Sequence, residues 1–223
     1  MSNRGENPKG LEEDLHKLID TNVIGNIHFY NLFMPLVLKG KVKKVICISS
    51  GMADLEMCNK FELETSSLYS ASKGAMNLVT AKFNAQYKKD GVLFLGICPG
   101  MVDVGKINPA ERTNNPPFPP PFPPSLVSFI KIQSDQSDKF SCTVTPHQLA
   151  GLQSMLGKFM QYAPHFKGPA TPEVSIRAVI NVWENASIEK GDGGAFLSHL
   201  GNKQWLWSAD KEPGRKPPSG LTE

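Results

Sequence analysis

The sequence predicts an α/β fold built on a parallel sheet, and two observations carry that prediction. Short, continuous apolar runs at residues 45–48 and 92–98 are typical of strands buried on both faces, as in parallel sheets. A segment with helical spacing of apolar residues precedes each run, so that helices and strands alternate along the chain. The predicted order is helix, strand, helix, strand, helices, strand.

Residues 11–38 are predicted to form one long helix. Apolar side chains recur along it at helical spacing: Leu11, Leu15, Leu18, Ile19 and Phe29. Pro35 falls in its last turn, and Gly40 suits its end. The apolar run at 45–48 follows it as a strand and ends at Ser49 and Ser50.

Residues 67–89 are predicted to form a second helix, which Asp90 and Gly91 end. One of its faces carries mostly small side chains that allow close packing on a sheet: Ala71, Ala75, Leu78 and Ala85. The strand at 92–98 follows and is stopped by Pro99 and Gly100.

The second half of the chain begins with a segment of a different composition. Within 108–145, seven of the nine residues 116–124 are proline, and a run rich in Ser, Asp, Gln and Lys follows. Such a segment favours polyproline II or lacks regular structure. Thr145-Pro146 and Thr171-Pro172 each place an N-cap residue before proline, which predicts helices at 146–161 and 172–185.

A last short strand is predicted at 195–200. We therefore expect one domain over 1–207, with the proline-rich insert at about 108–145, and a loose polar tail at 208–223.

Composition and charge exclude several classes of function. The 223 residues are 40% apolar and 20% charged with a formal net charge of +3, as in ordinary globular proteins. Lys and Arg are spread along the chain, so we expect no nucleic-acid partner. The longest apolar runs are too short or too interrupted to cross a bilayer, so we expect no membrane partner.

The four cysteines show no metal-ligand spacing, and Cys47 and Cys98 lie inside apolar runs. Buried free thiols and a cytoplasmic location are therefore expected.

Tyr69 and Lys73 form the pattern that carries chemistry. They lie four residues apart on a predicted helix, so their side chains share one face. A nearby ammonium favours the phenolate and lowers the pKa of a tyrosine, which then serves as a proton donor or acceptor for an alcohol or ketone. By itself the pattern also fits an exposed tyrosine beside a solvated lysine.

The surroundings of this pair favour the chemical interpretation. Ser50 follows one predicted strand and Pro99-Gly100 follows the next, and ligands of open α/β sheets bind at this carboxyl end. A serine hydroxyl there can hydrogen-bond a substrate oxygen as charge develops on it. A simple Ser-Ser-Gly turn is the alternative explanation.

Taken together, these segments resemble the short-chain dehydrogenase/reductase family over most of residues 11–206. The resemblance rests on four matching pieces: Thr21-Asn22-Val23-Ile24-Gly25, Ile48-Ser49-Ser50, Tyr69-Ser70-Ala71-Ser72-Lys73-Gly74 and Pro99-Gly100-Met101-Val102. The Ser-Ser-Gly-Met segment and the ending at 198–203 look like fungal members, including some of secondary metabolism. The resemblance implies a Rossmann-like doubly wound sheet and NAD(P)-dependent interconversion of a ketone and a secondary alcohol.

The resemblance also implies a role for each matching residue. Tyr69 would be the general acid/base, Lys73 would lower its pKa and hold the nicotinamide ribose, and Ser50 would polarise the substrate carbonyl. Asn22 would hold a water that relays protons to Lys73, although structural hydrogen bonding explains a buried amide on this helix equally well.

The resemblance further implies contacts between this chain and a cofactor. The cofactor would be NADP or NAD, with NADP slightly favoured. Pro99, Gly100 and Val102 would contact the nicotinamide. Val104 stands where the family usually has threonine, so one hydroxyl contact is lost. Residues 53–66 lengthen the interval between Ser50 and Tyr69 and are expected to form a loop over the substrate site, with Glu56, Glu62 and Glu64 solvated.

One expected part of the family's pattern is missing from this sequence, which contains no G-x-G-x-x-G or similar spaced-glycine turn. We expect the first βαβ unit, which cradles the pyrophosphate, to be absent. Three of the usual seven strands would remain, with an exposed edge at 45–48. An incomplete gene model and a genuine truncated paralogue that has lost catalysis both explain this, and the insert favours the first.

Two other functions stay open for a catalytically inactive chain. The prolines at 116–124 contain PxxP matches that suit SH3 or WW domains, although a spacer or spurious sequence explains them too. The helices near 11–38 and 67–89 commonly form a dimer interface in the family, which implies a homo-oligomer.

Overall fold

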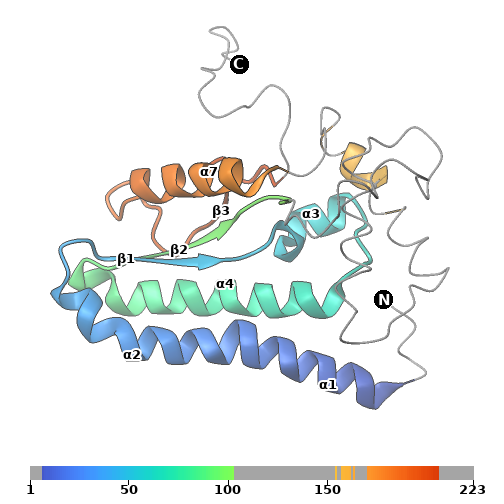
Figure 1. Ribbon diagram of the computed structural model, residues 1–223, viewed down its shortest axis with the longest axis horizontal. Coiled ribbons are helices and arrows are strands. Elements are labelled where there is room, and N and C mark those ends of the chain that lie inside the picture. The colour runs from blue at the N-terminus through green and yellow to red at the C-terminus, as the bar shows by residue number, and fades with distance from the viewer. Residues whose placement is uncertain (1–6, 103–153, 155–156, 162, 164–169, 206–223) are drawn as a thin grey trace, which may run out of the picture. The chain divides into compact units, whose positions relative to one another are not determined.

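The computed structural model describes residues 7–102, 154, 157–161, 163 and 170–205. The chain divides into two compact units, one made of Met1–Pro99 with Arg177–Trp205 and the other of Gly100–Ile176 with Leu206–Glu223. Within the first unit, helices cover both faces of a small parallel sheet (Figure 1). The predicted α/β class is confirmed.

The sheet has the strand order β1-β2-β3, formed by Lys44–Ile48, Leu93–Cys98 and Phe196–Ser198. Both pairings are parallel, and Lys44 lies opposite Leu93 in the first of them. The central strand β2 is buried along its whole length, as predicted. Among the described residues β1 has a strand on one side only, and Ile48 is 49% exposed. Val45 and Cys47 pack in the apolar layer on one face of β1 and Ile46 packs in the layer on the other, so both faces are covered, as predicted, although most of its side chains are only half-buried. The outer edge of β1 is unpaired among the described residues.

Two apolar layers hold the helices to the sheet. The segments α1 (Pro8–Ile19), η2 (Asp20–Ile24), α2 (Gly25–Lys39) and α4 (Ser67–Tyr87) lie on one face. Tyr30, Met76 and Phe94 are central to this layer. The helix α7 (Pro172–Asn185) matches its predicted bounds, and Val182 packs against Leu95 on the opposite face.

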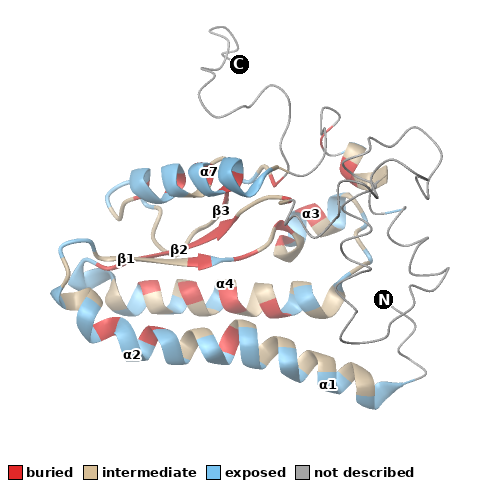
Figure 2. Cartoon of the chain, viewed as in Figure 1, coloured by how far each residue is buried: buried red, intermediate tan, exposed pale blue. Residues whose placement is uncertain are grey.

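The first long helix contains an irregularity that its sequence pattern did not indicate. Between α1 and α2, η2 is a π-helical turn, which holds one residue more than an α turn. The inward face downstream is therefore shifted by about one position, and Val23, Tyr30 and Met34 are buried. Phe29, predicted to lie on the apolar stripe, is 61% exposed. Buried and exposed positions alternate along α2 (Figure 2).

The buried face of α4 also differs from the prediction. Ala71 and Ala85 are exposed and Leu78 is 61% exposed, while Ser72, Met76, Thr80 and Asn84 are buried. The three buried polar side chains are satisfied by hydrogen bonds, since Ser72 and Thr80 donate to carbonyls of their own helix and Asn84 accepts from the Phe94 amide. Satisfied polar groups can be buried at little cost, so the helix need not turn its alanines inward.

The connection between β1 and α4 is more ordered than the predicted loop. It contains a 3₁₀ turn, η3 (Gly51–Ala53), and a short helix, α3 (Leu55–Lys60). Asp54 starts α3, because its carboxylate accepts a hydrogen bond from the Met57 amide at 2.7 Å. Glu56, Glu62 and Glu64 are exposed, as predicted.

The remaining predictions are confirmed in part or fall outside the described residues. α4 continues into a 3₁₀ turn, η4 (Lys88–Asp90), and ends at Gly91, whose φ of 74° requires glycine. The last strand is shorter than the predicted 195–200. In the second unit, residues 154 and 157–161 are helical, within the predicted 146–161. The insert at 108–145 and the tail at 208–223 lie outside the described residues.

Candidate active site

Ser50 lies at the carboxyl end of β1, where α/β sheets bind their ligands. The sheet pairing continues one residue beyond the strand, because the Ser49 amide donates to the Ile97 carbonyl at 2.8 Å. Ser50 then caps η3, and its Oγ accepts a hydrogen bond from the Met52 amide at 3.3 Å. The backbone thus fixes the position of this hydroxyl.

Tyr69 and Lys73 are brought to the same place by the first turns of α4. Lys73 Nζ donates to the Ile48 carbonyl at 3.0 Å, which ties it to the end of β1. Nζ lies 5.8 Å from the centroid of the Tyr69 ring. The Ser50 hydroxyl lies near enough to the Tyr69 phenol to lower its pKa. The three residues predicted to share a site are therefore close together in the first unit.

The pKa values of this pair are set mainly by burial. Burial raises the pKa of Tyr69 above its ordinary value, the Ser50 hydroxyl acts in the opposite direction, and the Cys98 thiol raises it further. Burial lowers the pKa of Lys73. Desolvation of the phenolate is the largest cause of the raised pKa, and Lys73 is not among the groups that shift it. The lowering of the Tyr69 pKa by Lys73 therefore stays a prediction.

Asn22 reaches α4 through a serine that the sequence interpretation did not single out. Its Nδ2 donates to Ser72 Oγ at 2.9 Å, and Ser72 Oγ donates to the Tyr69 carbonyl at 2.8 Å. The Asn22 carbonyl accepts from Asn26 Nδ2 at 2.9 Å. Asn22 lies in the π turn, so this chain of hydrogen bonds joins the π turn to the turn of α4 that carries Tyr69 and Lys73. The only sequence signal for Ser72 was its place inside the Tyr-Lys motif.

The residues after β2 that are predicted to contact the cofactor belong to different units. Pro99 ends the first segment of the first unit, whereas Gly100 and Val102 belong to the second unit. Gly100 has a φ of 78°, which favours glycine, and Val102 forms a parallel bridge with Ala170. Val104 lies outside the described residues. The structure therefore brings Ser50, Tyr69, Lys73 and Asn22 into one region and leaves the contacts of Gly100, Val102 and Val104 as predictions.

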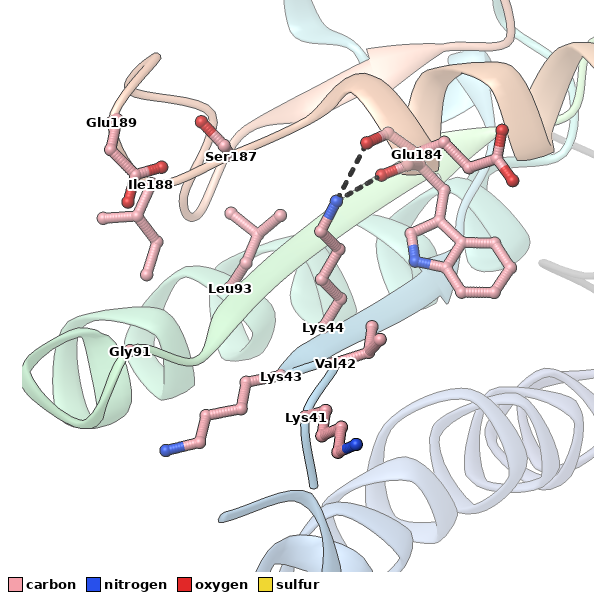
Figure 3. A pocket seen from close by; sticks show the side chains of 11 residues that line it. Lys41, Val42, Lys43, Lys44, Gly91, Leu93, Glu184, Ser187, Ile188 and Glu189 are labelled. Atoms are coloured by element: carbon pink, nitrogen blue, oxygen red, sulfur yellow. Dashed lines mark hydrogen bonds between the residues drawn. The ribbon is translucent and has the colours of Figure 1, made fainter. Parts of the chain in front are cut away.

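A cavity of about 510 Å³ lies at the other end of the sheet, where β1 and β2 begin (Figure 3). It is lined by Lys44, Leu93 and residues at the end of α7. Lys44 Nζ donates to the carbonyls of Trp183 and Glu184, both at 3.0 Å, and so caps the carboxyl end of α7. This cavity is separate from the Ser50–Tyr69–Lys73 site.

Other predictions concern metals, thiols and membranes. In the described part of the chain, no group of three or more His, Cys, Asp or Glu side chains is placed to hold a metal ion. Cys47 and Cys98 are buried free thiols, as predicted, and Cys58 is a half-buried one, while Cys142 lies outside the described residues. Of the helices that the structure describes, none is long and apolar enough to span a bilayer.

Comparison with known sequences identifies relatives of this chain. The sequence profile described as short chain dehydrogenase matches residues 1–115. The chain is 48% identical over 202 residues to short chain dehydrogenase virK of Hypocrea virens and 45% identical over 202 residues to short-chain dehydrogenase/reductase iacC of Pestalotiopsis fici. Each match covers 91% of this chain and 62% of the relative. The chain thus spans less than two thirds of the length of these relatives.

Solved structures show the same fold. The NADPH-bound carbonyl reductase from chicken fatty liver is similar with a TM-score of 0.52 at 18% identity, over 87% of this chain and 57% of that one. An NADPH-bound short chain oxidoreductase from Pseudomonas aeruginosa has a TM-score of 0.51 at 14% identity, over 83% of this chain and 55% of that one. A parallel sheet between helices, Ser50 beside Tyr69 and Lys73 at its carboxyl end, and a profile that covers more than half of the residues lead to one conclusion: the chain belongs to the short-chain dehydrogenase family.

Proposed function

We propose that this protein is an NAD(P)-dependent oxidoreductase of the cytoplasm that interconverts a ketone and a secondary alcohol, in reactions of the kind found in fungal secondary metabolism. The observation that carries the proposal is the placement of the Tyr69 phenol near Ser50, which lowers its pKa, and one helical turn from Lys73. The fungal relatives named as short-chain dehydrogenases support it. Buried free thiols support the cytoplasmic location.

The proposed roles follow from the atoms that these side chains present. In the direction of reduction, the Tyr69 hydroxyl donates its proton to the carbonyl oxygen of the substrate and becomes a phenolate. The Ser50 hydroxyl donates a hydrogen bond to that oxygen as negative charge develops on it. The Lys73 ammonium stabilises the phenolate electrostatically. Oxidation of the alcohol uses the same groups in reverse.

Asn22 acts indirectly in this scheme. Its amide is tied to Ser72, and Ser72 is tied to the Tyr69 carbonyl, so Asn22 fixes the turn of α4 that presents the pair. The water relay implied by the family resemblance is a further proposal for the same residue.

The residues present fit the nicotinamide end of the cofactor. Among the described residues Lys73 donates one hydrogen bond, to the Ile48 carbonyl, and an ammonium has three N–H donors, so two remain for ribose hydroxyls. Burial lowers the pKa of this ammonium, which means that a hydrogen-bonding or anionic ligand is favoured beside it. When bound, the nicotinamide supplies or accepts the hydride. The sequence holds no spaced-glycine turn for the pyrophosphate.

Cofactor binding to the purified chain tests this proposal, with NADPH and NADH titrated separately by calorimetry. We expect saturable binding that is weakened at least about tenfold by Lys73→Ala, because one to two charge-assisted hydrogen bonds are lost. Lys82→Ala is the matched control, since Lys82 is an exposed lysine further along α4. Equal binding by the two variants would contradict the assigned role of Lys73.

An exposed apolar face favours a second function, association with another copy of this chain. Phe29, Leu32 and Leu36 on α2 are 61%, 72% and 64% exposed, and Leu78 on α4 is 61% exposed. Large exposed apolar patches mark interaction surfaces. Dimerisation through the two helices would bury this face, as the family resemblance implies.

Sedimentation velocity over a range of concentrations tests the association. We expect a dimer that Leu32→Asp converts to a monomer, because an unpaired carboxylate would be buried in the interface. Leu55→Asp serves as the control, because Leu55 is 78% exposed on α3, away from this face. A wild-type chain that stays monomeric at every concentration would exclude the dimer.

A further inference from the structure

Gly51, the residue after Ser50, is held on two sides by buried side chains. Its amide donates to Cys98 Sγ at 3.1 Å. On the other side, a Cβ added to Gly51 would lie 2.7 Å from Trp205 Cβ and 2.8 Å from Trp205 Cγ. Distances under 3.0 Å are essentially never found for real Cβ atoms, so Trp205 occupies the space that any side chain at this position would need.

One contact comes from the end of β2 and the other from the segment that follows β3. Cys98 is the last residue of β2 and is 4% exposed. Trp205 is 3% exposed, and its ring stacks on Phe196 of β3 with centroids 4.5 Å apart. The end of β2 thus supplies one hydrogen bond, and the segment after β3 supplies one steric contact, to the same turn. Neither side chain moves without disturbing the core.

The position of this turn decides where the Ser50 hydroxyl points. Ser50 is extended, with φ −144° and ψ 137°, and Gly51 begins η3 immediately after it. The Ser50 carbonyl accepts from the Ala53 amide at 2.9 Å. A shift of Gly51 would therefore turn the peptide that follows Ser50 and move Oγ away from Tyr69.

We propose that Cys98 and Trp205 are positioning residues for the oxidoreductase reaction. They fix the position of Gly51 and thereby orient the Ser50 hydroxyl toward Tyr69. The Gly51 clamp consists of Gly51, Cys98 and Trp205. This inference rests on the proposed function. It adds to that function a steric requirement for glycine at position 51 and a hydrogen-bonding requirement at position 98, both outside the residues that touch the substrate.

The role of the hydrogen bond between the Gly51 amide and Cys98 is tested by hydrogen exchange of that amide, which does not depend on activity. Exchange of the Gly51 amide, followed by NMR or by mass spectrometry of overlapping peptides, is expected to accelerate at least about tenfold in Cys98→Ala, because the amide loses its acceptor. Cys98→Ser keeps an acceptor and is expected to restore most of the protection. Cys47→Ala is the control, as another buried thiol on a neighbouring strand. Unchanged exchange in Cys98→Ala would overturn this role.

The role of the steric contact is tested by a double-mutant cycle. Gly51→Ala is expected to lower kcat at least about tenfold in the wild-type background and less than about twofold in a Trp205→Gly background, where Cβ and the ring are gone. The KM for the cofactor is expected to stay constant, because the clamp acts through Ser50. An equal loss in both backgrounds would overturn the steric contact. If Trp205→Gly fails to fold, the Cys98 series decides the proposal.

The pH dependence of kcat distinguishes a role in orienting Ser50 from a role in stabilising the fold. Ser50 lowers the pKa of Tyr69, so displacing it is expected to move the Tyr69-dependent limb of the kcat profile to higher pH. Gly51→Ala is the variant for this measurement, because it leaves in place the Cys98 thiol, which itself acts on the Tyr69 pKa. A limb that does not move in Gly51→Ala would overturn the positioning role. A wild-type chain without turnover would refute the proposed oxidoreductase function, while the exchange experiment would still test the clamp.

Discussion

Replacement of Tyr69 by phenylalanine is expected to lower kcat for carbonyl reduction by about 10²–10⁴-fold, the usual contribution of general acid–base catalysis. The substitution removes the hydroxyl that is proposed to transfer the proton, and it leaves the ring beside Lys73 in place. Cofactor binding is expected to change little, because the Lys73 ammonium remains. The rate is followed by the loss of NADPH absorbance with a panel of ketones.

Tyr87→Phe is the matched control for this substitution. Tyr87 lies on the same helix, but its ring stacks in the core against Phe94, with centroids 6.1 Å apart. We expect wild-type turnover from this control. A Tyr69→Phe variant that turned over as fast as Tyr87→Phe would exclude Tyr69 as the proton donor.

Acid is expected to destabilise the protein through His199. This side chain is 2% exposed, directly after β3, and its burial lowers the pKa of the imidazole to about 4 from an ordinary value of 6.5. Between these two values the unfolded chain binds a proton that the folded chain does not. Stability is therefore unaffected above pH 6.5 and falls as the pH decreases toward 4, by roughly 3 kcal/mol in total.

Urea unfolding at a series of pH values measures this effect. The difference between the wild type and His199→Leu isolates the contribution of His199 from those of the carboxylates, and the variant is expected to lack this part of the slope. His16→Leu, which replaces an exposed histidine of α1, is expected to keep it. Parallel pH profiles for the wild type and His199→Leu would show that His199 titrates equally in both states.

The elements of the fold were largely predictable because they depend on local patterns. A proline after an N-cap threonine predicts the start of α7, and a continuous apolar run predicts β2. The π turn was not predictable, because its residues have the same sequence pattern as an ordinary α-helix. Only the packing of Tyr30 and Met34 on the sheet favours the additional residue of the π turn. The polar inward face of α4 was missed for a related reason: its burial depends on partners such as Asn22, which lies 50 residues away along the chain.

The sequence by itself determined the alternation of helices and strands and the chemistry of Ser50, Tyr69 and Lys73, because hydroxyl, phenol and ammonium groups at strand ends and one helical turn apart are properties of residue type and spacing. Only the tertiary structure decided which other side chains support them. Ser72, Cys98 and Trp205 meet the site through contacts made across the sheet and between helices, and Trp205 reaches Gly51 over 154 positions of sequence. Contacts between residues so far apart arise from the packing of strands and helices, which leaves no periodic signal in the chain.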